Sequence, residues 1–108
     1  MPAQIVTNQN FEEVILKSEI PVLIDFWGHN CQPCMRLSPI IDQIAERYLG
    51  RVQVVKINAT DYLEIAEKFE VSAVPTVMLY HQEVIDSFTG LPPNPMVSLV
   101  KMIDQALN

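Results

Sequence analysis

The sequence is short of three things that many functions require: basic residues, long apolar runs and cysteines. Its 108 residues hold 7 Lys and Arg against 13 Asp and Glu, a formal net charge of -6. A chain without a basic patch cannot neutralise phosphates, which argues against nucleic acid and anionic membrane surfaces as partners. No apolar stretch approaches the ~20 residues of a membrane-spanning helix. Residues 1–10 contain no Lys or Arg and no apolar core typical of a signal peptide. We therefore expect a cytoplasmic protein.

What is present suits one folded domain. Hydrophobic residues make up 49% of the chain and charged residues 19%, a composition that excludes a disordered chain. A chain of this length buries roughly two-thirds of its unfolded surface, which is enough for one core. No internal repeat and no long linker divides the sequence. We therefore expect residues 1–108 to form a single domain.

The only two cysteines, Cys31 and Cys34, are separated by two residues. They follow a short apolar run and precede a helical pattern. In a cytoplasmic protein a lone C-x-x-C is more often a redox or metal site than a structural staple. The only histidines, His29 and His81, do not provide the spacing of a zinc site. Redox chemistry is therefore the main hypothesis, and a metal site or a pair of structural thiols are the alternatives.

Hydrophobic periodicity predicts alternating strands and helices that end in a hairpin and a last helix. Strands linked by helices pair in parallel through right-handed crossovers, and the hairpin adds antiparallel strands. The run 22–27 is apolar on both faces, which is typical of a central strand covered on both sides, and Asp25 is its exception. Strands are expected at 5–6, 22–27, 52–57, 76–80 and 84–88, and helices near 11–15, 33–48, 61–69 and 95–107.

Local signals indicate where some elements begin and end. The pairs Asn10–Glu13 and Asp61–Glu64 are expected to start short helices, and Asn94 is expected to cap the last one. Gly50 is expected directly after the long helix. The hairpin link at His81-Gln82 contains no residue that readily takes a positive φ.

Several motifs follow one another along the chain: Asp25-Phe26-Trp27, Cys31-Gln32-Pro33-Cys34, Pro39, Lys56, Val74-Pro75-Thr76 and Gly90. With these motifs the chain resembles the thioredoxin family along nearly its whole length. The resemblance implies an α/β thioredoxin fold with three α/β/α layers and a central mixed five-stranded sheet flanked by four helices. It also implies a cis peptide bond between Val74 and Pro75. Asn30 and Gln32 depart from the Trp and Gly that the family usually has beside the first cysteine.

The resemblance implies dithiol–disulfide exchange, with Cys31 as nucleophile, Cys34 as resolving thiol and a redox-active disulfide between them. A helix N-terminus stabilises the thiolate that attacks. Asp25 is the candidate base for Cys34, because burial raises the pKa of a carboxyl group. Lys56 is expected beside Asp25, where it moderates that rise. The plainer alternatives are backbone donors that satisfy Asp25 and a snorkelling Lys56. His29, two residues before Cys31, is a candidate to tune the thiolate when its ring is protonated.

The resemblance further implies protein disulfides as substrates and a thioredoxin reductase, linked to NADPH or ferredoxin, as electron donor. It implies a monomer that binds no cofactor. Two alternatives are a specialised redox protein with a shifted potential or a narrow partner range, suggested by Asn30 and Gln32, and a binding subunit that does not use its thiols. The residues expected to contact substrate are Trp27, Gln32, Pro33, Val74, Pro75, Gly90 and Leu91.

Overall fold

A five-stranded mixed sheet forms the centre of the computed structural model, which describes residues 3–108. Its strands lie in the order β1-β3-β2-β4-β5. β1 and β2 run parallel to β3, whereas β4 is antiparallel to both β2 and β5. This confirms the parallel first part and the antiparallel hairpin. The strands are β1 (Gln4–Ile5), β2 (Val22–Trp27), β3 (Gln53–Asn58), β4 (Thr76–Tyr80) and β5 (Val84–Thr89).

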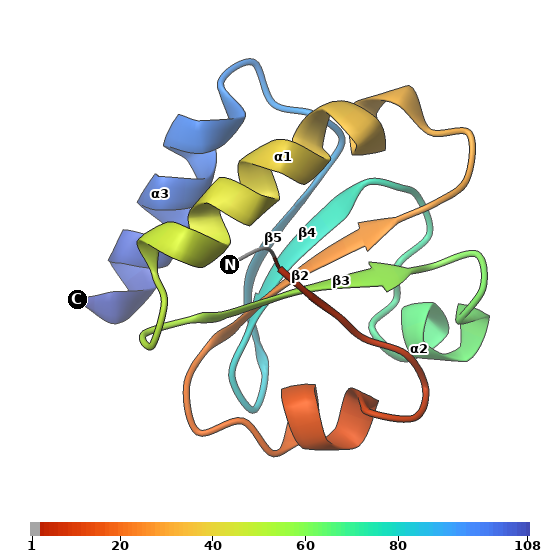
Figure 1. Ribbon diagram of the computed structural model, residues 1–108, viewed down its shortest axis with the longest axis horizontal. Coiled ribbons are helices and arrows are strands. Elements are labelled where there is room, and N and C mark those ends of the chain that lie inside the picture. Colours follow the sequence, from red (N-terminus) through yellow and green to blue (C-terminus); the bar gives the residue numbers. More distant parts are fainter. Residues whose placement is uncertain (1–2) are drawn as a thin grey trace.

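Helices cover both faces of this sheet and complete the expected three layers (Figure 1). α1 (Gln32–Arg47) and α3 (Pro95–Leu107) lie side by side over one face, here the α1/α3 face. η1 (Glu12–Leu16) and α2 (Leu63–Lys68) cover the other, the η1/α2 face. The first of the four expected helices, η1, is a π-helix rather than an α-helix. Within residues 3–108, no helix combines the length and apolarity that crossing a membrane requires.

Strand β2 shows how the sequence pattern produces two separate cores. Side chains alternate along a strand. Val22, Ile24 and Phe26 therefore enter the core of the η1/α2 face, and Leu23 enters the core of the α1/α3 face. By the same alternation Asp25 points toward α1. Because both faces are covered, this strand is apolar throughout except at the position that carries a carboxylate.

Two of the expected helix starts are wrong, because side chains find partners elsewhere. Asn10 accepts a hydrogen bond from Thr7 N–H at 2.8 Å and does not cap η1, which has no side-chain cap. Asn58 Oδ1 accepts from the backbone N–H of Thr60 (2.9 Å) and Asp61 (3.1 Å), so α2 begins only at Leu63. These turns satisfy donors that a helix would otherwise leave free.

The last helix starts as expected. The Asn94 side chain accepts from Val97 N–H at 3.4 Å, and Pro95 occupies the first helical turn, where its missing N–H is harmless. Leu99 and Ile103 are buried against the sheet. Met102 is buried as well, whereas Met96 and Leu107 are only partly buried.

Two loop expectations need correction. Gln82 adopts φ +66° in the β4–β5 hairpin, although the sequence offered no residue that favours this conformation. The backbone N–H of His81 donates to Glu83 O at 2.9 Å and closes the turn. Gly50 has φ +84° but lies two residues after the C-cap Tyr48, later than expected.

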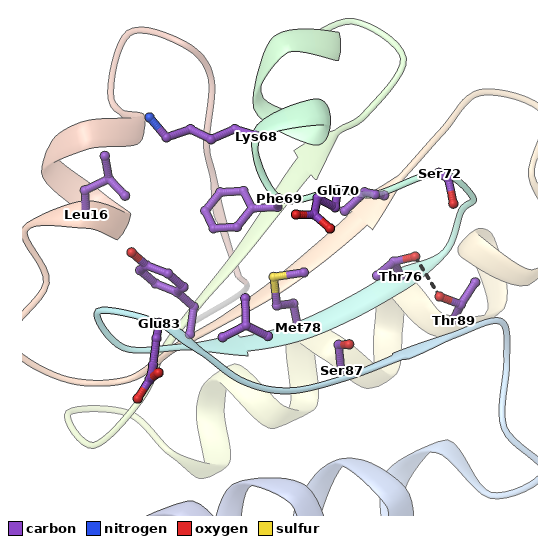
Figure 2. A pocket seen from close by; sticks show the side chains of 13 residues that line it. Leu16, Lys68, Phe69, Glu70, Ser72, Thr76, Met78, Glu83, Ser87 and Thr89 are labelled. Atoms are coloured by element: carbon purple, nitrogen blue, oxygen red, sulfur yellow. Dashed lines mark hydrogen bonds between the residues drawn. The ribbon is translucent and has the colours of Figure 1, made fainter.

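A groove of about 560 Å³ lies on the η1/α2 face between α2 and the β4–β5 hairpin (Figure 2). It forms because α2 ends at Lys68 and leaves the adjoining part of β4 and β5 uncovered. Its lining mixes apolar side chains such as Phe69 with hydroxyls, including those of Thr76 and Thr89, whose oxygens lie 3.1 Å apart. None of the predicted site residues lines this groove.

Candidate active site

The two cysteines form a disulfide at the beginning of α1. Cys31 is the N-cap, and its Sγ accepts a hydrogen bond from Cys34 N–H at 3.2 Å. Cys34 is buried, with 3% of its surface exposed, whereas Cys31 is half-buried. The sulfur that meets solvent therefore also faces the unpaired N–H groups of a helix N-terminus, where an anion is stabilised.

The loop that leads into Cys31 is tightly constrained. A Cβ on Gly28 would lie 3.1 Å from both Thr60 Oγ1 and Val74 Cγ2, so the backbone approaches these two loops closely. Asn30 has φ +54°, a left-handed conformation that Asn tolerates better than most residues. The expected departure from the family at Asn30 thus coincides with a special backbone conformation next to the nucleophile.

His29 connects this loop to the turn after β3. Its Nε2 lies 3.2 Å from Asn58 Nδ2 and 3.4 Å from Asp61 Oδ1, and its ring meets Trp27 edge-on at 5.8 Å. Asn58 and Asp61 were not expected near the site. His29 and Asp61 both have more than half of their side-chain surface exposed, so solvent screens this pair.

A second loop meets the cysteine loop at the end of β2. The Val74–Pro75 peptide bond is cis, as the resemblance implied. Phe26 pairs with Thr76 across β2 and β4, which places Trp27 and Pro75 at the same end of these strands. Gly90 N–H donates to Pro75 O at 2.8 Å. The structure thus brings four of the expected contact residues together: Trp27, Val74, Pro75 and Gly90.

The other expected contact residues surround this group less closely. Gln32 and Pro33 are exposed on the first turn of α1, beside the disulfide. Leu91 is half-buried and packs against the core of the α1/α3 face. Met35 is also exposed, at 66%.

Asp25 is buried, with 1% of its surface exposed, and its Oδ1 has no hydrogen-bond partner among the described residues. The alternative in which backbone donors satisfy this carboxyl group is therefore wrong for Oδ1. Burial raises the pKa of Asp25 to about 7; the positive charge of Lys56 opposes the rise and the negative charge of Asp42 adds to it. The carboxyl group changes its charge near neutral pH.

Lys56 pairs with Asp25 in the β2–β3 register, but its ammonium group binds elsewhere. Its Nζ donates to Ser38 Oγ at 2.6 Å and lies 3.0 Å from Asp42 Oδ1. The side chain is only 15% exposed, which excludes the snorkelling alternative. The expected pairing of Lys56 with Asp25 is therefore correct for the backbones of the two strands. It is wrong for the ammonium group, which binds residues of α1 instead.

A cleft of about 320 Å³ connects Asp25 to the disulfide. Its walls come from β1, β2, β3, the cysteine loop and α1, and they are mostly apolar. The residues that line it are Ile5, Asp25, Trp27, Gly28, His29, Asn30, Cys31, Cys34, Met35, Ser38 and Lys56.

Sequence reasoning missed Ser38 and Asp42, although a signal was present. Both follow Cys34 at intervals of four residues, which places all three on one side of a helix. A hydroxyl and a carboxylate on a helix side that faces a buried lysine are candidate partners for that lysine.

Comparison with known proteins agrees with the geometry. A family model described as Thioredoxin matches residues 2–105. The chain is similar to thioredoxin from Rickettsia bellii, with 44% identity over 80% of this chain and 83% of that protein. It is also similar to thioredoxin 1 from Synechococcus elongatus, with 34% identity over 97% of both chains. With thioredoxin M-type, chloroplastic, from Pisum sativum the identity is 35%, over 88% of this chain and 56% of that protein. The chain belongs to the thioredoxin family and is a thiol–disulfide oxidoreductase.

Proposed function

We propose that Cys31 attacks the disulfide of a protein substrate and that Cys34 resolves the product. The Cys31 thiolate bonds to one substrate sulfur, and the other leaves as a thiol after taking up a proton. The Cys34 thiolate then attacks Cys31 Sγ, forms the Cys31–Cys34 disulfide and releases the second substrate sulfur as a thiol. Two electrons pass from the protein to the substrate, and the disulfide form seen here is the product.

The difference in exposure between the two sulfurs is the observation that carries this assignment. Cys31 is half-buried at the helix N-terminus, whereas Cys34 is 3% exposed. A large substrate reaches only the first sulfur. The second reacts when a mixed disulfide already holds its target within the same molecule, where proximity favours attack.

We further propose that Asp25 is the base that takes the proton from Cys34. Both residues line the 320 Å³ cleft, which is large enough for water to carry the proton between them. A carboxyl group with a pKa of about 7 is well matched to proton transfer at neutral pH. Lys56 acts on this group only through its charge, because its ammonium group is held by other residues.

The substrate chain is proposed to lie across Trp27, Val74 and Gly90. Val74 is half-buried, and neither its N–H nor its C=O makes a hydrogen bond to another described residue. An extended substrate segment can pair with these groups, as in other strand-addition complexes. Gln32, Pro33, Pro75 and Leu91 complete the proposed contact surface around the disulfide.

The proposed cellular role is a cytoplasmic electron carrier that acts as a monomer of one domain, residues 1–108. A thioredoxin reductase, linked to NADPH or ferredoxin, returns the disulfide to the dithiol form. The chain itself needs no bound cofactor for this exchange, because the two thiols carry both electrons.

Serine substitutions test these roles with insulin as substrate. Cys31→Ser is expected to abolish disulfide reduction, and Cys34→Ser to accumulate a mixed disulfide through Cys31 that mass spectrometry detects. The Cys31→Ser, Cys34→Ser double variant supplies the baseline. Full turnover by either single variant, or a mixed disulfide through Cys34 alone, would overturn the assignment.

A narrower range of partners is the second candidate, because Asn30 and Gln32 are both exposed beside the disulfide. Equilibration with a glutathione or thioredoxin couple decides between the two. A reduction potential near about −270 mV, characteristic of thioredoxin, supports a general reductase. A much higher potential supports a specialised redox protein.

A further inference from the structure

The ammonium group of Lys56 is held by two side chains of α1. Ser38 Oγ accepts its hydrogen bond at 2.6 Å, and Asp42 Oδ1 lies 3.0 Å from Nζ. Asp42 is itself anchored, because the same Oδ1 accepts from the backbone N–H of Ala3 at 3.0 Å. Burial raises the pKa of Asp42, but the bonds from Ala3 and Lys56 outweigh this and hold it below the ordinary value. Asp42 is therefore a stable anion at neutral pH.

This arrangement matters because Asp25 is the nearer partner along the sheet. Asp25 and Lys56 are paired residues of neighbouring parallel strands, which lie about 4.8 Å apart. Side chains of such a pair point to the same face, and the lysine side chain is long enough to reach the carboxylate. Yet Asp25 Oδ1 has no hydrogen-bond partner among the described residues.

We propose that Ser38 and Asp42 are positioning residues that hold the Lys56 ammonium away from Asp25, so that the carboxylate keeps no cationic partner. An ammonium group at hydrogen-bond distance would favour the ionised carboxylate and make it a weaker base. Held on α1 instead, the same charge acts only from a distance. The inference rests on the proposed role of Asp25 as the base for Cys34.

The resolving step requires an Asp25 carboxylate that can accept a proton. In the resolving step the Cys34 thiol gives its proton to the Asp25 carboxylate, directly or through water. The Cys34 thiolate then attacks Cys31 Sγ and displaces the substrate sulfur. The neutral Asp25 carboxyl group later returns the proton to solvent through the cleft. A direct ion pair with Lys56 would oppose the first of these transfers.

Charged and redox-active groups approach Asp25 from β3, from α1 and from the loop after β2. Lys56 faces Asp25 from β3, Asp42 from α1, and the two cysteines from the start of α1. His29 lines the same cleft from the loop after β2 and lies beside Asp61 rather than Asp25. The position of the Lys56 charge is therefore the variable that Ser38 and Asp42 control.

The test measures the pKa of Asp25 in the oxidised protein by NMR of its side-chain carboxyl carbon, with no catalysis involved. Ser38→Ala changes no charge and is expected to lower this pKa, because the ammonium group loses one of its two partners. Asp42→Asn is expected to lower it further, by about one unit, which is a tenfold change in the ionisation ratio.

Lys56→Met provides the control, because it removes the charge that is being positioned. In a Lys56→Met background, Ser38→Ala is expected to leave the Asp25 pKa nearly unchanged, and Asp42→Asn is expected to lower it only by the small direct effect of the Asp42 charge, less than with Lys56 present. A simple loss of the Asp42 charge would instead lower the pKa equally in both backgrounds, and this would overturn the proposal. An unchanged pKa in both Ser38→Ala and Asp42→Asn would overturn it too.

The pH profile of the resolving step separates this inference from the proposed function. If Asp25 is the base, Asp42→Asn shifts the rise of the single-turnover rate to lower pH by the same amount and lowers the plateau. If the Asp25 pKa falls and the rate profile does not move, the positioning of Lys56 is supported and the role of Asp25 as base is wrong.

Discussion

The two faces of the sheet are covered by cores of different composition. The η1/α2 face is closed by an aromatic group in which Phe69 meets Phe11, Phe26 and Tyr80 with ring centroids 5.4 to 5.8 Å apart. The α1/α3 face is aliphatic over most of its area but holds Asp25 and Lys56 near the start of α1. The core of one face is thus dominated by aromatic packing, and the other combines apolar packing with buried charged groups.

The two faces therefore have different roles: one mainly stabilises the fold, and the other holds the groups that take part in the reaction. Aromatic pairs add to the stability gained from apolar burial. A buried carboxyl group without a full set of hydrogen bonds reduces stability whenever it is ionised. The η1/α2 face can therefore support the sheet while the α1/α3 face carries a group that opposes folding at neutral pH.

Removing the central ring of the η1/α2 face should have the largest effect. Phe69→Ala is expected to lower the free energy of unfolding by about 3–5 kcal/mol, because it removes a buried ring and three aromatic contacts. Denaturant titration measures this loss. Phe69→Leu is the matched control and should lose clearly less, since it keeps most of the buried volume.

If the two faces are independent, Phe69→Ala should leave the disulfide-exchange reaction unchanged. The rate of disulfide reduction per folded molecule should match the unsubstituted protein in Phe69→Ala, because no cleft residue is altered. A large drop in that rate would show that the two faces are not independent.

Removing the Asp25 charge from the α1/α3 face should stabilise the protein at neutral pH. The pKa of Asp25 rises from 3.8 to about 7 on folding, so the folded state binds the proton more tightly than the unfolded state. The stability of the unsubstituted protein should therefore fall as pH rises from about 4 to 7, by about 4 kcal/mol in total. Asp25→Asn, which does not ionise, should lack this fall.

Urea titrations of both proteins at pH 4 and pH 8 measure the difference. The gain from Asp25→Asn should be about 4 kcal/mol larger at pH 8 than at pH 4, because at pH 4 the carboxyl group is neutral in the folded state and only about half ionised in the unfolded state. An equal difference at both pH values would show that burial does not raise the pKa of Asp25. The same variant should slow the resolving step, in line with the proposed role as base.

The sequence predicted the fold well because the two cores leave a strong pattern. Strand β2 and strand β4 were placed with their observed bounds, since apolar runs between turn signals identify buried strands. The cysteine pair and Asp25 were equally visible, because cysteines are rare here and a carboxylate inside an apolar strand is unusual. The thioredoxin resemblance then supplied the cis bond at Pro75.

Contacts between distant polar side chains were not predictable in the same way. Lys56 was expected beside Asp25 from strand pairing, but Ser38 and Asp42 compete for it across the α1–β3 packing. Local polar contacts were missed as well: Asn58 Oδ1 accepts from the backbone N–H groups at the turn that Asp61 was expected to start, and Gln82 adopts a positive φ in the hairpin. Polar side chains have several possible partners, and their choice among these partners leaves no periodic pattern in the sequence.

A polar contact that ties the two helices of the α1/α3 face gives a smaller effect. Tyr48 OH donates to Asp104 Oδ1 at 2.6 Å and joins the end of α1 to α3, while the ring stays buried. Burial and then Asp104 raise the pKa of Tyr48, so the phenol remains a donor at neutral pH. Tyr48→Phe should lower the free energy of unfolding by about 1–2 kcal/mol.

Thermal or urea unfolding at pH 7 measures this change. The matched control is Asp104→Asn, which keeps an acceptor oxygen but removes its charge and should lose less than Tyr48→Phe. If Tyr48→Phe has no effect, the two helices of this face are held together by apolar packing alone.

The smallest effect should come from the start of α3. The Asn94 side chain accepts a hydrogen bond from Val97 N–H at 3.4 Å, a long bond that satisfies one donor at the helix N-terminus. Asn94→Ala should lower the free energy of unfolding by about 0.5–1 kcal/mol, at the low end for an N-cap. Asn94→Asp is the control and should be neutral or slightly stabilising, since a negative charge suits this end of a helix. Because α3 packs in the core of the α1/α3 face, hydrogen exchange in Asn94→Ala should rise at its first turn and stay unchanged in α2. Faster exchange in α2 would mean that the two faces unfold together rather than as separable parts.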